Sequence, residues 1–432
     1  MAGSSYYRAT AETLVCNLQR IASHRGTGYC MKIILLSYFE VTMTNIHHWQ
    51  HHASVDAALR QLADYGPVLD TAITVQQIAA PTFAEQRRGD FVLEYMQTLQ
   101  LHDLQRDAVG NVYGRHPGYT NGPALLVTAH MDTVFPEDTD LTLRWVGEQL
   151  YGPGIGDNSL GVAALLHLAR VIHEYDLPHA HDIWFVADVG EEGLGDLCGM
   201  RAVIERLRSQ IGAVIVLEGC DFGKLHHQAI GVRRYRIDVT APGGHAWGDF
   251  GNVSAVHVLV RIASRLTELS VAIEPRSTFN IGVIRGGTAI NAIAEHASLL
   301  LDLRSVDTTT LQVLITQVET IVADQAALYP EAQVTLTLVG DRPAGAIARE
   351  HPLIRAATAA YTAVGATVSY VQSSTDANIP LSQNIPAVCI GLANGQNAHR
   401  SDEYIVPTNL GRGMQALLLL AMAASDQVIA DC

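Results

Sequence analysis

Four short runs of consecutive apolar residues constrain the fold of this chain more than any other feature of its sequence. They lie at 124–129, 183–187, 213–217 and 386–391. An unbroken run of this length is typical of a central strand whose two faces are both buried. A stretch with helical spacing, 160–173, separates the first two runs. Strands that alternate with helices predict an α/β fold, with a mixed, mostly parallel sheet flanked by helices.

The region 231–341 follows a different pattern. Polar and apolar residues alternate over 234–240, which is typical of a strand with one buried and one exposed face. The other expected elements are helices near 254–269 and 308–323 and strands at 278–284, 298–304 and 334–339. The resulting order, β-α-β-β-α-β, is the ferredoxin-like α+β arrangement. We therefore expect a smaller domain inserted into a larger one, which is formed by 45–230 and 342–432.

The N-terminal region is harder to interpret. Residues 1–44 show no clear period, and a second possible start, Met43, lies just before a helical pattern. We interpret 1–44 as an upstream extension, with a peripheral helix as the alternative. Helical spacing then predicts helices over 54–80, with Ser54 as N-cap, and over 82–99.

Composition excludes several classes of protein. A chain of 432 residues is long enough for about two domains. With 48% hydrophobic and 16% charged residues it is not a disordered chain. Its net charge of −15 argues against a nucleic-acid partner, because surfaces that bind nucleic acid are basic. Six scattered cysteines and the lack of an apolar run of about 20 residues predict a cytoplasmic protein with reduced thiols and no membrane span.

Side chains that can bind metal or move protons follow each of the four apolar runs. The carboxyl ends of parallel strands meet at one edge of a sheet, so we expect these side chains to converge there. The set consists of His130 and Asp132 after the first run, Glu191 and Glu192 after the second, Glu218 after the third and His399 after the last. The glycine-rich loop 152–158, which leads into a helix, adds Asp157.

These acidic residues point to a metal. Carboxylates cannot share a buried pocket without a counter-charge, and nothing basic lies at these strand ends. One or two divalent ions are the expected counter-charge, and imidazole with carboxylate suits zinc, and also manganese or cobalt. Each element alone has a simpler explanation, since a histidine at a strand end is commonly structural and a Glu-Glu pair commonly faces solvent. The ordered combination is what favours a metal site.

The same residues resemble the di-zinc hydrolase superfamily of acetylornithine deacetylase, succinyl-diaminopimelate desuccinylase, aminoacylase, glutamate carboxypeptidase and peptidase T. The motifs are Ala-His-Met-Asp-Thr-Val at 129–134, Gly-Asp-Asn at 156–158, Glu-Glu-Gly at 191–193, Gly-Gly-His-Ala at 243–246, and His399 with Glu403 following. The likeness covers nearly everything after about residue 54. It implies a zinc-peptidase-like catalytic domain with an inserted ferredoxin-like lid, 231–341, and a homodimer formed through that lid.

The resemblance also implies a ligand set. His130 and Glu218 would bind one zinc ion, and Glu192 and His399 would bind the second. Asp157 would bridge the two ions, and the peptide bond after this residue is typically cis in the superfamily.

Further roles follow from the same resemblance. Asp132 would orient the first histidine ligand through its other ring nitrogen. Glu191 would be the general base on a metal-activated water. His245, in the lid, would stabilise the oxyanion, and in dimeric relatives it comes from the other subunit. Arg304 and Asn291 would bind a substrate carboxylate, although the arginine fits a structural ion pair with a nearby aspartate equally well.

Together these parts predict a co-catalytic di-zinc metallohydrolase, a peptidase or amino-acid deacylase, that cleaves an amide or peptide bond of a small N-acyl amino acid or short peptide. Two departures leave the substrate open. Residues 247–251 lack the nearby proline of many relatives, and 373–378 lacks the arginine that follows the aspartate in desuccinylases. The alternative is a catalytically silent member that acts as a binding protein, but such a member should have lost ligands or the base.

Overall fold

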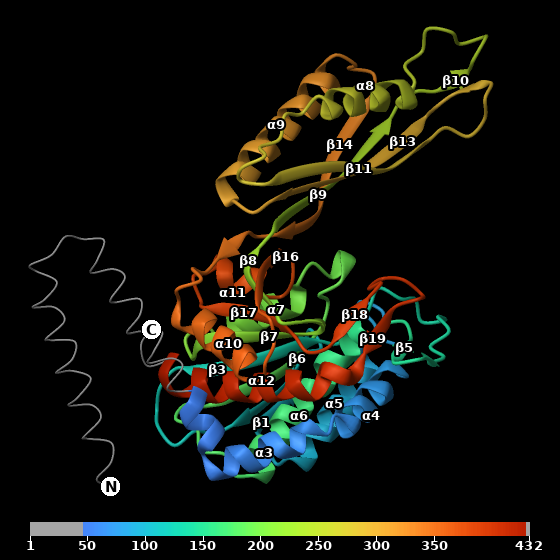
Figure 1. Ribbon diagram of the computed structural model, residues 1–432. Helices are drawn as coiled ribbons and strands as arrows, with labels where there is room; N and C mark the ends of the chain where they lie inside the picture. Colours follow the sequence, from blue (N-terminus) through green and yellow to red (C-terminus); the bar gives the residue numbers. More distant parts are fainter. Residues whose placement is uncertain (1–45, 429–432) are drawn as a thin grey trace, which may run out of the picture.

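The computed structural model describes residues 46–428, so the expected extension 1–44 lies outside the described residues. Figure 1 shows a larger unit and a smaller one, joined through strands β9 (Gly231–Thr240) and β14 (Gln333–Arg342). The three cysteines of the described part, Cys198, Cys220 and Cys389, are free.

The larger unit is built on a mixed nine-stranded sheet in the order β1-β2-β6-β3-β7-β17-β8-β15, with β16 paired to β8. Its strands are β1 (His102–Arg106), β2 (Val112–His116), β3 (Ala124–His130), β6 (Ile183–Asp188), β7 (Ile211–Phe222), β8 (Lys224–Ala229), β15 (Gly345–Ala346), β16 (Ser369–Ser373) and β17 (Ala387–Gly391). The four apolar runs form β6, β3, β7 and β17, which are neighbours and run parallel. The α/β fold with a mixed sheet is therefore confirmed.

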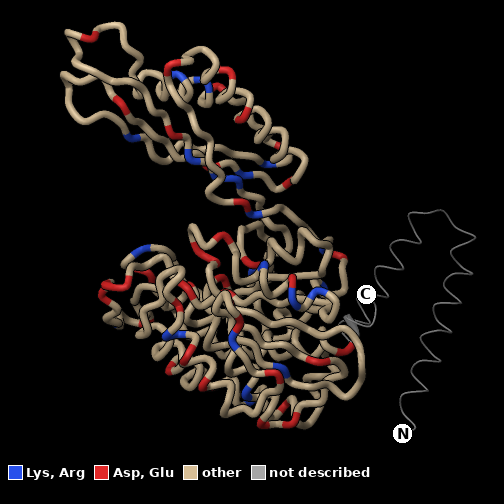
Figure 2. Tube along the Cα trace, turned by 180° about the vertical axis from the view of Figure 1, so that it is seen from behind, with Lys and Arg blue, Asp and Glu red and all other residues tan. Residues whose placement is uncertain are grey.

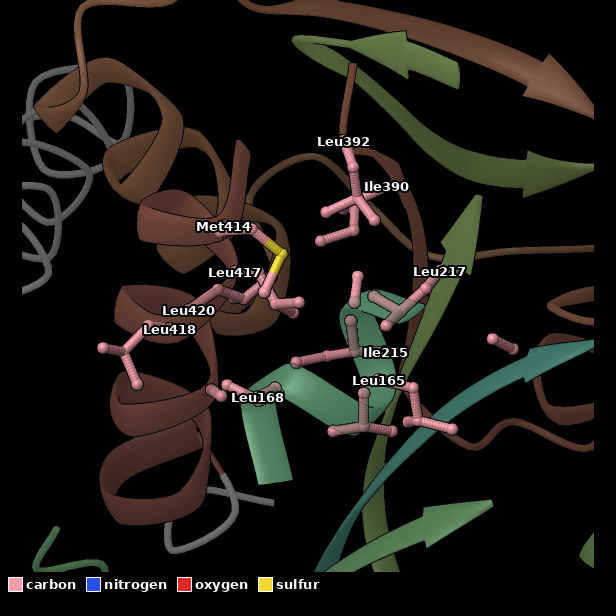
Figure 3. Close-up of a cluster of buried hydrophobic side chains, with 14 of the residues drawn as sticks. Leu165, Leu168, Ile215, Leu217, Ile390, Leu392, Met414, Leu417, Leu418 and Leu420 are labelled. Atoms are coloured by element: carbon pink, nitrogen blue, oxygen red, sulfur yellow. The ribbon is translucent and has the colours of Figure 1, made fainter. Parts of the chain in front are cut away.

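Helices cover both faces of this sheet. They are α3 (Ala53–Ala63), α4 (Gly66–Gln76), α5 (Gln86–Thr98), α6 (Gly161–Glu174), α7 (Cys198–Leu207), α10 (Pro352–Ala363), α11 (Asn378–Ser382) and α12 (Leu410–Ala423). Successive residues of a strand point to opposite faces, so Leu125 joins the core under α6 and α12, whereas Leu126 joins the core under α7. Figure 3 shows the first core, where Leu165 of α6 and Leu417 of α12 lie near Ile215 of β7.

One helical stretch of the described residues, Ile155–Glu174, is long and apolar enough to cross a membrane. However, 89% of its most apolar window is buried inside the protein. Burial of this kind is that of a core helix, because α6 packs between the sheet and α12.

The expected helix 54–80 is divided in two. Helix α3 ends at Ala63 and α4 begins at Gly66, with Pro67 in its first turn. Proline lacks an N–H group and is tolerated in a first turn but not inside a helix, which explains the break. Ser54 is not the N-cap either, because His52 holds that position.

The smaller unit is an antiparallel sheet in the order β11-β13-β9-β14 with two helices on one face. Its further elements are β11 (Ser277–Gly286), β13 (His296–Ser305), α8 (Ala255–Thr267) and α9 (Thr308–Ala327), with a two-stranded pair, β10 (Gly244–His245) and β12 (Ala292–Ile293). Buried and exposed residues alternate along β13, as expected for a strand with one covered face. Figure 1 shows β10 at the end of this unit that lies farthest from the larger sheet.

The larger unit also contains a small four-stranded sheet in the order β18-β19-β5-β4, whose strand β18 packs against β7. Its strands are β4 (Arg144–Val146), β5 (Gln149–Tyr151), β18 (Asn394–Gln396) and β19 (Tyr404–Val406). Short helical turns lie at Ile155–Leu160, Gly193–Gly195, Pro407–Asn409 and Ala424–Val428. The loop between β18 and β19 carries His399.

Candidate metal centre

Five of the predicted side chains meet at the carboxyl edge of the large sheet. They form two groups that share one aspartate, and within each group the possible ligand atoms lie within 4.8 Å of one another. The groups are His130, Asp157 and Glu218, and Asp157, Glu192 and His399. Because these residues come from five separate parts of the chain, the convergence expected from the strand ends is present.

The distances show how the groups share Asp157. Its Oδ1 lies 3.2 Å from His130 Nε2, and its Oδ2 lies 3.0 Å from His399 Nε2. His130 Nε2 is also 3.8 Å from Glu218 Oε2, and His399 Nε2 is 3.0 Å from Glu192 Oε1. Each imidazole thus faces two carboxylates, and each group joins imidazole and carboxylate donors, which suit zinc, manganese or cobalt.

Asp132 fixes the first histidine and the loop of the two glutamates. Nδ1 of His130 lies 3.1 Å from the main-chain oxygen of Asp132 and 3.4 Å from its carboxylate. The same carboxylate accepts the N–H groups of Glu191 at 3.0 Å and Glu192 at 2.9 Å. Burial opposes ionisation of Asp132, but the hydrogen bond and charge of His130, with the N–H of Glu192, outweigh it and lower the pKa of its carboxyl. A stably ionised Asp132 can hold the ring of His130 in place.

Glu403 fixes the loop of the shared aspartate. Its buried carboxylate accepts the N–H groups of Gly154, Gly156 and Asp157 at 2.7, 2.8 and 2.8 Å. Asn158 adds a bond from its side chain to the main-chain oxygen of Leu217 at 2.9 Å, which ties the loop to β7. The peptide bond Asp157–Asn158 is cis, as the resemblance implies.

The site is electrostatically unbalanced. Burial raises the pKa of Glu191 to about 8, although the charge of Arg342 opposes the shift, and burial also raises the pKa of Glu218. Hydrogen bonds to Asp157 and Glu192 raise the pKa of His399 to about 11. The carboxylates of the site therefore attract positive charge to the space between them and the two imidazoles. Divalent cations bound in that space would supply this charge.

Sequence analysis missed the basic residue of this site. Arg342, the last residue of β14, lies beside Glu191, and its Nη1 donates to Glu191 Oε1 at 3.0 Å. The expectation concerned only the ends of the four apolar runs, whereas Arg342 reaches the acids from a strand of the smaller unit. Arg342, Arg234 and Arg304 line a cavity of about 590 Å³ together with the candidate ligands. Figure 2 shows Lys and Arg positions along the base of the smaller unit, where it meets the larger one.

The residues predicted to contact the substrate do not meet at the donor groups. Arg304 lines the cavity but donates to Asp302 at 2.7 Å, so the ion-pair alternative is realised in this structure. His245 lies in β10, at the far end of the smaller unit, and Asn291 is its neighbour there, because its main-chain oxygen accepts the N–H of Ala246 at 3.0 Å. Neither residue lines the cavity within this chain.

The chain is similar to known proteins both in sequence and in structure. Carboxypeptidase G2 of Pseudomonas sp. (strain RS-16) is 28% identical over 243 residues, which are 55% of this chain and 56% of that protein. The aligned part thus spans little more than half of that relative.

Solved structures share the fold. A tripeptidase from Staphylococcus aureus has a TM-score of 0.71 and 22% identity, over 84% of this chain and 99% of that one. A structure from Bacillus subtilis, described as a dinuclear metal-binding peptidase of the M20 family, has a TM-score of 0.62 and 16% identity, over 85% and 98%. The model of peptidase family M20/M25/M40 matches residues 126–423, and the chain belongs to this family.

Proposed function

We propose that this protein is a metal-dependent hydrolase that cleaves the amide or peptide bond of a small N-acyl amino acid or a short peptide. The observation that carries the proposal is the position of Asp157, whose two oxygens face the two histidines of separate donor groups. A shared carboxylate between two such groups is the arrangement that holds two metal ions about 3.5–4 Å apart. Membership of a peptidase family supports the same reaction class.

His130, Glu218, Glu192 and His399 are the proposed ligands, with Asp157 between the ions. Zinc is the proposed metal, and cobalt or manganese would suit the same donors. When bound, the ions would polarise the substrate carbonyl and acidify a water to a pKa of about 7.

The chain's own residues then move the proton and hold the geometry. Glu191 lies next to the ligand Glu192 and lines the same cavity, so it is placed to accept a proton from the attacking water and to deliver it to the leaving nitrogen. Asp132 keeps the ring of His130 oriented. Arg304 is the cavity cation that we propose for a substrate carboxylate, after exchange of its bond to Asp302.

The smaller unit is proposed to act as a lid and to pair two chains. His245 and Asn291 lie away from the cavity of their own chain, so they would act on the cavity of a partner chain. A symmetric dimer through the smaller unit would exchange these residues reciprocally.

The test is a hydrolysis screen of N-acyl amino acids, dipeptides and tripeptides with protein freed of metal and then supplied with zinc, cobalt or manganese. We expect turnover that needs added metal and falls by at least about 100-fold in Glu191→Gln. Turnover in fully metal-free protein would contradict the proposal. Tight metal binding without turnover of any substrate would favour the alternative, a silent member that binds ligands.

A further inference from the structure

A buried arginine from the junction of the two units holds the candidate base. Nη1 of Arg342 donates to Glu191 Oε1 at 3.0 Å, and Nη2 donates to the main-chain oxygen of the same residue. The two side chains are only 6% and 8% exposed. One bond holds a carboxylate oxygen of Glu191 and the other holds its backbone, so the planar guanidinium fixes the side chain relative to the main chain, which a single point charge would not do.

Strands β9 and β14 also hold the rest of the loop that carries Glu191. Arg234, in β9, donates from Nη1 to the main-chain oxygen of Gly193 at 3.1 Å. The N–H of Asp341, in β14, donates to Asp196 Oδ1 at 2.9 Å. Strands β9 and β14 are also the connections between the units, so the loop 191–196 is attached to the junction itself.

We infer that Arg342 is a positioning residue that sets the carboxylate of Glu191 and makes its position depend on the orientation of the smaller unit. The inference rests on the proposed function, because it takes Glu191 as the base. A rotation of the smaller unit about β9 and β14 moves the backbone of Arg342, and the guanidinium transmits that movement to Glu191. Closure of the smaller unit over a substrate would then align the base only when the substrate is in place.

The size of the expected effect follows from geometry. A displacement of a reacting group by about 1 Å can cost about 100-fold in rate. Loss of Arg342 removes one donor to the carboxylate of Glu191 and one donor to its main-chain oxygen, whereas the candidate metal ligands keep their own contacts. The predicted loss is therefore in kcat and not in bound metal.

The test compares Arg342→Met and Arg342→Lys with a matched control, Arg233→Met. Arg233 lies in the same junction and its Nη2 is 3.2 Å from Asp341 Oδ1, but the contacts of Arg342 to Glu191 do not involve it. For each variant we would measure kcat, KM, metal per chain and the midpoint of thermal unfolding, with zinc-loaded full-length protein and the best substrate of the screen.

Support would be a fall in kcat of about 100-fold for Arg342→Met, with KM within about threefold, metal content as in the wild type, and an intermediate kcat for Arg342→Lys. The inference is overturned by a kcat within about threefold of the wild type, by an equal loss in Arg233→Met, or by a loss that follows metal content. If Arg342→Met does not fold, Arg342→Lys provides the test, because lysine keeps a buried positive charge but lacks the planar set of donors of a guanidinium. A wild-type kcat in Arg342→Lys would then overturn the inference. An inactive wild type would instead refute the proposed function, so the two failures are distinguishable.

Discussion

The carboxylate of Glu403 accepts the main-chain N–H of Asp157 at 2.8 Å, although the two residues lie 246 positions apart. The same carboxylate accepts two further N–H groups of this loop. The buried carboxylate of Glu403, from a late part of the chain, thus fixes the loop that carries the aspartate shared by both donor groups.

Glu403→Ala should weaken metal binding by about 10- to 100-fold, because supports of this kind orient the ligands. It should also lower the free energy of unfolding, since each buried N–H group left unpaired costs about 1–3 kcal/mol, and the N–H groups of Gly154 and Gly156 make buried bonds. Competition with a chromophoric chelator and urea unfolding measure the two effects. Glu403→Gln, which keeps one acceptor oxygen, should lose less, and unchanged metal affinity in Glu403→Ala would refute this role.

Asp157→Ala should remove metal from both groups at once, because its two oxygens serve one group each. We expect elemental analysis of dialysed protein to show much less bound metal than in the wild type. We expect the hydrolytic activity to fall with the metal content. Asp140→Asn, at an exposed position with local bonds to Thr142, is the control for loss of a carboxylate. Wild-type metal content in Asp157→Ala would mean that the two groups do not share this ligand.

Glu191→Gln should lower kcat by about 100- to 10,000-fold, the range of general acid–base catalysis, while metal content stays constant. The amide has nearly the same shape but cannot accept the proton. Glu350→Gln, at an exposed position, should keep the wild-type rate. Turnover near that of the wild type in Glu191→Gln would remove this residue as the base.

His245→Ala should lower kcat with little effect on metal content, if His245 acts on the cavity of a partner chain. Mixing this variant with Glu191→Gln, after both are dissociated and reassociated, should then restore activity. Random pairing gives mixed dimers in which one of two sites has both residues, so roughly a quarter of all sites become active. Failure of the mixture to recover activity, together with a monomeric protein in solution, would contradict the exchange.

Stability should fall below about pH 6.5, the usual pKa of histidine, because of His116. Burial, together with the nearby His179 and His173, lowers the pKa of His116 from 6.5 to about 4. Between pH 6.5 and about 4, the imidazole of His116 is therefore protonated in the unfolded chain but neutral in the folded chain. The free energy of unfolding consequently decreases as pH falls through this range. Urea unfolding at several pH values should show a smaller decrease for His116→Gln than for the wild type. His257→Gln, on an exposed part of α8, should keep the wild-type dependence.

The sheet and the donor groups were predictable because their signals are local. A buried parallel strand needs an apolar run, and the edge where such strands end brings His130 and Glu218 together whatever the intervening loops do. The alternation of β13 likewise follows from one covered face. Each of these features depends on a few consecutive residues.

The contacts that hold the site were not predictable in this way. Arg342 lies 151 positions from Glu191, and its contact depends on how the smaller unit joins the larger one, which no periodic pattern encodes. Glu403 was noticed only as a residue after a histidine, because nothing local shows that three N–H groups will surround it. The break between α3 and α4 could have been read from Gly66 and Pro67, since proline favours the start of a helix.

The order in which the site residues are synthesised has a consequence for the cell. His399 and the loop anchor Glu403 come after β17, and α12 must still fold over the core before they are fixed. His130, Asp157 and Glu218 form one donor group, whereas the second group also needs His399. A chain that stops before β18 therefore lacks one of the two histidines of the donor groups and the carboxylate that holds the loop of Asp157.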